Sequence, residues 1–129
     1  VKIWASDNDL LKVSNAPNLV FPEETVPESW RTYTVAGKHG QTFTSEVRDA
    51  ILFEFSDVLN TTGLPKMDIV VARDVLSFHK EPDQRRILEM FEENMKPGGV
   101  LILGKNEQPA EALAWDEING ENLTLYRRR

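Results

Sequence analysis

Residues 67–72 read Met-Asp-Ile-Val-Val-Ala, an almost wholly apolar run that the charged pair Arg73-Asp74 follows at once. Such a run predicts a strand that is covered on both faces. Residues 81–96 come next and place apolar side chains at three- and four-residue steps, which predicts a helix. The pair Gly98-Gly99 ends this helix, and a second apolar run, VLIL, follows at residues 100–103. Strands that alternate with helices in this way predict an α/β domain with a mainly parallel sheet.

The rest of the chain continues the pattern of short strands and turns. Three further apolar runs predict strands, at residues 1–6, 51–55 and 123–126. Residues 32–36 and 42–47 flank the turn Gly-Lys-His-Gly and predict a β-hairpin. Residues 17–30 contain three prolines, so little regular structure is expected there. Residues 110–118 are compatible with either a helix or a strand.

Polar side chains follow three of the predicted strands at the point where each strand ends. Asp7 ends the first strand, Asp57 follows the strand at residues 51–55, and Arg73-Asp74 follow the strand at residues 67–72. Ligands of open α/β sheets bind outside the carboxyl ends of the strands. These three clusters are therefore the candidate functional site.

Position alone leaves two interpretations open for Asp7 and for the pair Arg73-Asp74. The Asp7 carboxylate can accept hydrogen bonds from ribose hydroxyls, as in nucleotide sites. Alternatively, Asp7 or Asn8 caps a short helix that contains Leu10 and Leu11, which is the commoner role for such residues. The pair Arg73-Asp74 either faces a ligand crevice or forms a local ion pair, and the ion pair is the safer interpretation.

The composition excludes several classes of protein. The chain has 129 residues, of which 40% are hydrophobic and 28% are charged, as expected of one folded domain with a real core. Its 15 basic and 21 acidic residues give a net charge of −6, which opposes binding to nucleic acid or to an anionic membrane. It has no Cys and two separated His, so neither cysteine catalysis nor a metal site is expected. The lack of Cys and of a signal-like start fits a cytoplasmic protein.

Four stretches together carry a family resemblance. Residues 72–79 (ARDVLSFH) are similar to a C-R-N-V-L-I-Y-F signature, and residues 97–107 (PGGVLILGKNE) to a P-G-G-x-L-x-L-G-x-S-E segment. Residues 3–9 (IWASDND) are similar to I-x-A-T-D-I-D, and residues 53–59 (FEFSDVL) to F-x-x-x-N-L-L. Taken in their order along the chain, the four segments resemble those of the CheR-type chemotaxis methyltransferases. Each match is weak alone, but four in register over essentially the whole chain are specific.

The resemblance implies a Rossmann-like class I methyltransferase sheet with a small β-hairpin insertion. Enzymes of this family use S-adenosylmethionine to methylate glutamate side chains of chemoreceptors, so a chemoreceptor or another signalling protein is the implied partner. By the same resemblance, Asp7 would bind the ribose, and Asp57 and Val58 would lie beside the adenine. Ala72 and Arg73 would line the cofactor pocket. The implied cofactor-binding residues are Asp7, Asp57, Val58, Ala72, Arg73 and Asp74. Phe78 stands where the family carries a tyrosine, so a hydroxyl that could orient the methyl acceptor is gone.

The resemblance also implies an incomplete sheet. The strand at residues 1–6 matches the family's second strand, so the first strand and its cofactor loop are absent, and residues 1–129 would form a single, N-terminally truncated CheR-like domain. We therefore expect the chain alone to bind the cofactor poorly and to be inactive. Without a central strand, two neighbouring strands have open edges that invite pairing with another chain, including a homodimer. The alternative function is that of a degenerate, non-catalytic methyltransferase fold that acts as a protein-interaction or dimerisation module.

Overall fold

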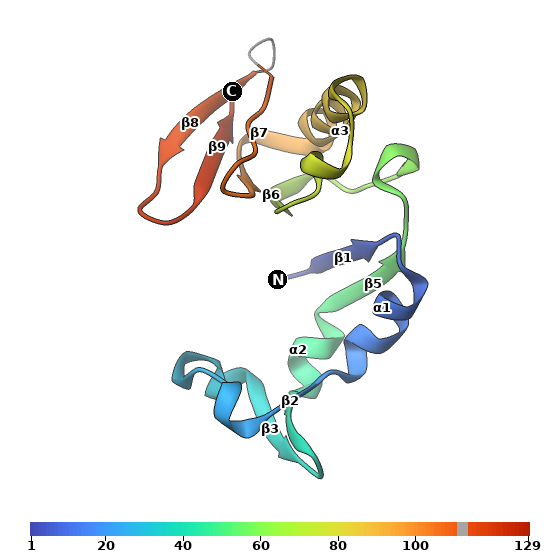
Figure 1. Cartoon of the computed structure of the whole chain (residues 1–129), viewed down its shortest axis with the longest axis vertical. Coiled ribbons are helices and arrows are strands. Elements are labelled where there is room, and N and C mark those ends of the chain that lie inside the picture. Colours follow the sequence, from blue (N-terminus) through green and yellow to red (C-terminus); the bar gives the residue numbers. More distant parts are fainter. Residues whose placement is uncertain (111–113) are drawn as a thin grey trace. The chain divides into compact units, whose positions relative to one another are not determined.

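The computed structural model describes residues 1–110 and 114–129, which form two compact units, Val1–Asn60 and Thr61–Arg129 (Figure 1). Each unit contains its own parallel strand pair and is described by itself below. The single domain over residues 1–129 stays a prediction. Within the described ranges, no helix is both long enough and apolar enough to cross a membrane.

The N-terminal unit is built on two parallel strands. Strand β1 (Ile3–Asp7) pairs with β5 (Ile51–Phe55), and Asp7 lies opposite Phe55 at the carboxyl end of the pair. Both predicted strands are thereby confirmed. Helix α1 (Leu10–Asn15) follows β1, contacts both strands and runs into a 3₁₀ turn at residues 16–18.

The residue that caps α1 differs from the prediction. The Asp9 carboxylate, rather than that of Asp7 or Asn8, accepts hydrogen bonds from the backbone amides of Leu11 and Lys12, at 3.0 and 3.2 Å. Asp and Asn are almost equally good caps, so the choice among Asp7, Asn8 and Asp9 depends on the residue at which the strand ends. Because β1 extends to Asp7, the helix can begin only after Asp9.

A small antiparallel sheet lies in the sequence between β1 and β5. Its strands are β2 (Val20–Phe21), β3 (Thr34–Gly37) and β4 (Gly40–Phe43), in the order β2-β4-β3. The pairing of β3 with β4 confirms the predicted hairpin. Its second arm ends at Phe43, earlier than predicted, because the Thr44 hydroxyl accepts from the Val47 amide and starts helix α2 (Ser45–Asp49). The proline-containing segment before the hairpin holds only β2 and short 3₁₀ turns.

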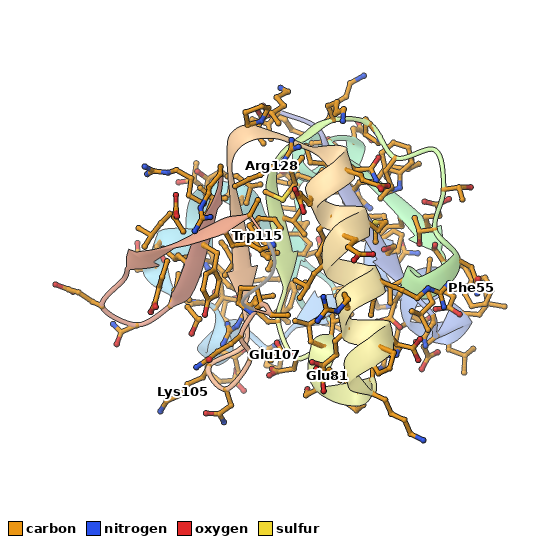
Figure 2. All side chains as sticks on the ribbon, turned by 90° about the horizontal axis from the view of Figure 1, so that it is seen from above. Phe55, Glu81, Lys105, Glu107, Trp115 and Arg128 are labelled. Atoms are coloured by element: carbon orange, nitrogen blue, oxygen red, sulfur yellow. The ribbon has the colours of Figure 1, made fainter. Side chains whose placement is uncertain are left out.

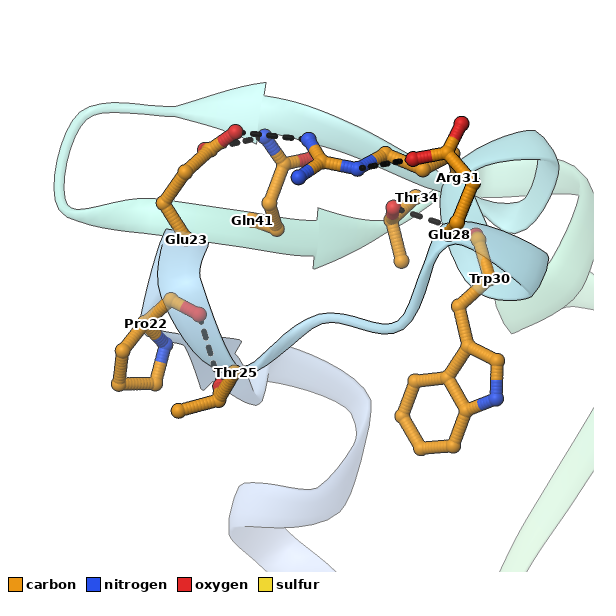
Figure 3. A network of polar contacts seen from close by, with 8 residues as sticks. All are labelled: Pro22, Glu23, Thr25, Glu28, Trp30, Arg31, Thr34 and Gln41. Carbon is orange, nitrogen blue, oxygen red and sulfur yellow. Dashed lines mark hydrogen bonds and ion pairs between the residues drawn. The ribbon is translucent and has the colours of Figure 1, made fainter.

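A polar network ties the segment before the hairpin to β4 (Figure 3). The Glu23 carboxylate accepts from the Arg31 guanidinium at 2.7 Å and from the Gln41 amide at 2.6 Å, and Glu28 lies 3.7 Å from the same guanidinium. The hydrogen bond from Gln41, followed by that from Arg31, holds the pKa of the Glu23 carboxyl below its usual range. Since the folded state lowers this pKa, the network contributes to the stability of the fold at neutral pH. This contribution is lost as the pH falls into the acid range.

The C-terminal unit has one four-stranded sheet and one long helix. Strand β6 (Met67–Ala72), helix α3 (Glu81–Asn94) and strand β7 (Met95–Leu103) follow one another, as predicted. They are followed by β8 (Trp115–Asn119) and β9 (Thr124–Arg128). The order is β6-β7-β9-β8, with β6 and β7 parallel and the last two strands antiparallel. The segment predicted as a helix or a strand is thus a strand from Trp115 onward, whereas residues 111–113 lie outside the described residues.

Helix α3 passes directly into β7 at Met95, before the glycine pair is reached. Gly98 has a backbone φ of 79°, the left-handed conformation that was expected of a glycine after a helix. At Gly99, a Cβ atom would lie only 2.9 Å from the Lys96 carbonyl oxygen and 3.1 Å from that of Asp68. The helix ends at Asn94, two residues before its predicted end, and β7 begins at once. The glycines therefore lie within β7, where the pairing with β6 shifts register.

The core of the C-terminal unit lies under α3. The buried side chains there come from the apolar stripe of the helix and from alternate positions of β6 and β7; they include Val70, Ala72, Ile87, Leu88, Phe91, Met95, Leu101 and Leu103. The other face of β6 carries Ile69 and Val71, which are 61% and 65% exposed. The prediction that this strand is covered on both faces is therefore wrong, because an apolar run does not reveal how many faces the neighbouring elements cover.

Candidate cofactor-binding site

Asp7 lies at the carboxyl end of the N-terminal parallel pair. Its side chain is half-buried, and its Oδ1 accepts a hydrogen bond from the Asp9 amide at 2.8 Å. Within the described part of the chain, no donor contacts the second oxygen, Oδ2. The capping interpretation of Asp7 is wrong, since Asp9 has that role. Asp7 thus presents a fixed carboxylate with one oxygen available for a hydroxyl donor.

Asp57 and Val58 lie at the same end of this pair. The Ser56 amide donates to the Asp7 carbonyl at 3.0 Å, which fixes the chain beside Asp7 as it leaves β5. The Asp57 carboxylate accepts from the Leu59 amide at 3.0 Å and from the Asn60 side chain at 3.1 Å. Asp57 therefore stabilises a 3₁₀ turn over residues 58–60, which begins with the half-buried Val58.

A pocket of about 200 Å³ lies beside Asp7 within the N-terminal unit. It is formed by β1, α1 and β5, and its lining is mostly apolar: Ala5, Ser6, Asp7, Lys12, Val13, Ala16 and Phe53. Ligand pockets usually measure about 300–1,000 Å³. This pocket can therefore accept a part of a nucleoside-sized ligand, and Asp7 is one of the residues that line it.

The turn after β6, in the C-terminal unit, carries the second group of predicted site residues. Glu107, which is 5% exposed, joins this turn to the turn after β7. Its Oε1 accepts from the amides of Asp74 and Gly104, at 2.7 and 2.8 Å, and its Oε2 accepts from the Ser77 amide at 2.9 Å. Lys105, from the same turn as Glu107, is exposed and points outward (Figure 2). The two carboxyl ends of the parallel pair are thus held together by one buried carboxylate.

Helix α3 holds the far end of the turn after β6. The Gln84 side-chain amide donates to the carbonyl oxygens of Leu76 and His79, at 2.9 and 2.8 Å. Leu76 is 1% exposed and anchors the same 3₁₀ turn in the core. The segment that leaves β6 is therefore fixed at both ends, whereas Phe78 within it is 83% exposed.

Arg73 and Asp74 are exposed at the start of this turn. Among the residues that the structure describes, neither side chain forms an ion pair, so the local ion-pair interpretation is wrong. The Asp74 backbone has a φ of 57°, which is uncommon for a residue other than glycine. The sharp turn explains how the chain exposes this pair directly after the buried Ala72.

The predicted site residues fall into two groups, each at the carboxyl end of a parallel pair. Asp7, Asp57 and Val58 lie together in the N-terminal unit, and residues 72–74 lie together in the C-terminal unit. Glu107 is the last residue of the segment 97–107 that carries the family resemblance, but it was not predicted as part of the site. The available signal was a Gly-x-x-Glu spacing directly after an apolar strand, which places a carboxylate at the strand's carboxyl end.

Parallel strands linked by helices, with polar residues at their carboxyl ends, are typical of open α/β sheets that bind a ligand at that edge, as Rossmann-like methyltransferases do. The chain belongs to the CheR methyltransferase family, whose S-adenosylmethionine-binding domain it matches over residues 1–120. The predicted family and the predicted Rossmann-like fold class are thereby confirmed.

Two curated relatives share sequence with the chain. Chemotaxis protein methyltransferase 2 of Vibrio cholerae serotype O1 is 26% identical over 115 residues, which cover 83% of this chain and 40% of that protein. An uncharacterized 104.1 kDa protein in the hypE 3′ region of Rhodobacter capsulatus is 29% identical over 113 residues, which cover 83% of this chain and 12% of that protein. The chain therefore spans less than half the length of either relative.

The fold is also similar to that of the N-methyltransferase NodS from Bradyrhizobium japonicum WM9. The TM-score is 0.62 at 13% identity, and the match covers 98% of this chain and 73% of NodS. A second NodS structure, in complex with S-adenosyl-L-homocysteine, matches 61% of this chain and 55% of that chain with a TM-score of 0.50 and 19% identity. At these identities, the likeness supports the fold alone.

Proposed function

We propose that this chain is part of a protein-glutamate O-methyltransferase of chemotaxis signalling, with a chemoreceptor or a related signalling protein as the methyl acceptor. The family match carries the proposal, together with the name of the Vibrio cholerae relative. When bound, S-adenosylmethionine supplies the methyl group, so the chain's own residues need only bind and orient the reactants.

The residues present fit one part of S-adenosylmethionine. The Asp7 carboxylate offers Oδ2 to the ribose hydroxyls, and the apolar wall of the adjacent pocket and the turn at Val58 suit the adenine. The exposed start of the turn after β6, residues 72–74, offers further contacts in the C-terminal unit.

We further propose that the 129-residue chain binds the cofactor weakly and does not transfer methyl groups by itself. The pocket beside Asp7 is smaller than a usual ligand pocket. In addition, among the described strands, β1 has β5 as its only partner and β6 has only β7, so one edge of each carries unpaired backbone groups. A binding site built on strands with unpaired edges is poorly preorganised, which lowers its affinity for the cofactor.

Titration of the ¹⁵N-labelled chain with S-adenosylhomocysteine tests both proposals. We expect amide shift changes at the six predicted cofactor residues, with a dissociation constant weaker than about 100 µM, equivalent to a binding free energy of about −5.5 kcal/mol. Guanosine serves as the control ligand. If no amide responds, the cofactor-binding function is wrong; if calorimetry gives low-micromolar binding, the weak-binding proposal is wrong.

Asp7→Ala should abolish the response of Asp57 and Val58 at the same ligand concentration. The variant removes the proposed acceptor of the ribose hydroxyls, and a hydrogen bond to a charged group contributes about 1.5–3 kcal/mol. Asp9→Asn is the matched control, because Asn also caps helices and lies only two residues away. An unchanged response of Asp7→Ala would remove Asp7 from the proposed site.

We also propose that the free edge of β6 pairs with a second copy of the chain. In an antiparallel pairing centred on Val70, Ile69 of each copy would lie opposite Val71 of the other, so four exposed β-branched side chains would form two cross-strand pairs. The same register would place Asp68 opposite Ala72, which avoids opposing like charges. The edge is therefore complementary to itself.

Light scattering across a concentration series should reveal a monomer–dimer equilibrium. Val71→Lys should shift it to monomer, because a charged residue on an edge strand opposes pairing. Leu52→Lys, at a 52% exposed position of β5, is the control and should leave the equilibrium unchanged. A wild-type chain that stays monomeric at all concentrations would contradict the proposal.

A further inference from the structure

We infer that Glu107 is a positioning residue for the cofactor-contacting start of the turn after β6, residues 72–74. The inference rests on the proposed function, because the contacts that it would position are those proposed for the cofactor. Glu107 comes from the turn after β7 and was not among the predicted contacts. Its role would be to fix the backbone of a neighbouring segment rather than to contact the ligand.

The Glu107 carboxylate is engaged by backbone amides from two separate segments. Asp74 and Ser77 donate from the turn after β6, and Gly104 donates from the end of β7, all at 2.7–2.9 Å. An ionised carboxylate accepts at both oxygens and donates nothing, so it can satisfy three convergent N–H groups. Charge-assisted bonds of this kind are about twice as strong as neutral ones. A buried carboxylate with such partners holds the two turns in one arrangement.

Two features of the surrounding backbone fit this arrangement. Asp74 has the unusual φ of 57°, and its amide is one of the two that donate to Oε1. At Gly104, a Cβ atom would lie 2.5 Å from the Asp74 carboxylate and 2.6 Å from that of Glu107. Only glycine allows the turns to approach this closely. The Glu107 carboxylate thus compensates an otherwise unfavourable backbone geometry at the point where residues 72–74 leave the strand.

The hydrogen bonds of Glu107 hold backbone rather than the apolar core. The core contacts come from α3, β6 and β7, and Leu76 and Gln84 fix the far end of the turn after β6 independently. Weakening the Glu107 bonds should therefore change the conformation of residues 73–77 while the remainder of the unit stays folded. This separates positioning from general stability.

Glu107→Gln tests the role with little change in size. A Gln side chain replaces one acceptor oxygen by an NH₂ group, which must face at least one of the three N–H donors. We expect the amide resonances of Asp74, Ser77 and Gly104 to move upfield, and the affinity for S-adenosylhomocysteine, followed at residues 72–74, to fall about tenfold, equivalent to about 1.4 kcal/mol.

Two control variants separate positioning from stability. Lys105→Gln changes an exposed residue of the same turn and should alter neither readout. Leu88→Val trims the core and should lower the stability of the C-terminal unit without shifting the three amide resonances. An unchanged response of Glu107→Gln to the ligand, beside a normal wild-type response, would overturn the positioning role alone. A wild-type chain without any response would overturn the proposed function, and this role with it.

Discussion

Leu101→Ala should lower the free energy of unfolding of the C-terminal unit by about 3 kcal/mol, within the range measured for buried Leu→Ala changes. Leu101 is 0% exposed and lies in β7, opposite Val70 of β6 and Tyr126 of β9. The truncation removes apolar contacts on both sides of a central strand and leaves a cavity that the paired strands cannot close. Urea titration with the fluorescence of the buried Trp115 as the probe measures the change, in a background where the other two tryptophans are Phe.

Leu52→Ala is the matched control for this experiment. Leu52 is also on a parallel strand but is 52% exposed, so we expect a loss below about 1 kcal/mol in its own unit. If Leu101→Ala cost no more than Leu52→Ala, the core of the C-terminal unit would not be packed as described.

Gly40→Ala should destabilise the small antiparallel sheet by about 3 kcal/mol, since strained conformations alone cost about 1–3 kcal/mol. Gly40 has a φ of 143°, and a Cβ atom there would lie 2.4 Å from the Phe21 carbonyl oxygen. That oxygen belongs to the backbone of β2, the strand paired with β4, so it cannot move without breaking the pairing. Amide hydrogen exchange at Val20 and Thr42 should report the loss directly.

Gly63→Ala separates conformational strain from the steric clash. Gly63 has a φ of 72°, but no atom lies within 4 Å of the site of its Cβ. We therefore expect only the cost of a left-handed conformation, about 1–2 kcal/mol. Equal losses for the two variants would mean that the approach of Phe21 to Gly40 contributes nothing.

The main elements of both units could be predicted because their apolar patterns match one kind of structure. The run at residues 67–72 is too short for a buried helix, and the stripe at residues 81–96 has only helical periodicity. The cap of α1 could not be predicted, because Asp7, Asn8 and Asp9 all suit it chemically. The exposure of Ile69 could not be predicted either, because the hydrophobicity of a side chain does not show whether a neighbouring element covers it.

The candidate site could be predicted only for residues that directly follow a predicted strand in the sequence. Asp7 and Asp57 could be placed together because both follow strands, and the ends of parallel strands meet. The hydrogen bonds of Glu107 could not be predicted, because its partners Asp74 and Ser77 are far away in the sequence. Recognising that contact requires knowing that β6 and β7 are neighbours, and the strand order is a property of the folded sheet.

The spacing of the paired strands has a consequence for the order in which the chain folds. Ile118 pairs with Leu125 across a short connection, and Val70 pairs with Leu101 around one helix. Ile3, by contrast, pairs with Ile51, so this contact closes a much longer loop and costs more chain entropy. Prior formation of the small β2-β4-β3 sheet would shorten that loop, since it brings Phe21 and Gln41 together. Contacts between residues far apart in the sequence form slowly. The pairing of β1 with β5, and with it the surroundings of Asp7, would therefore form among the last events of folding.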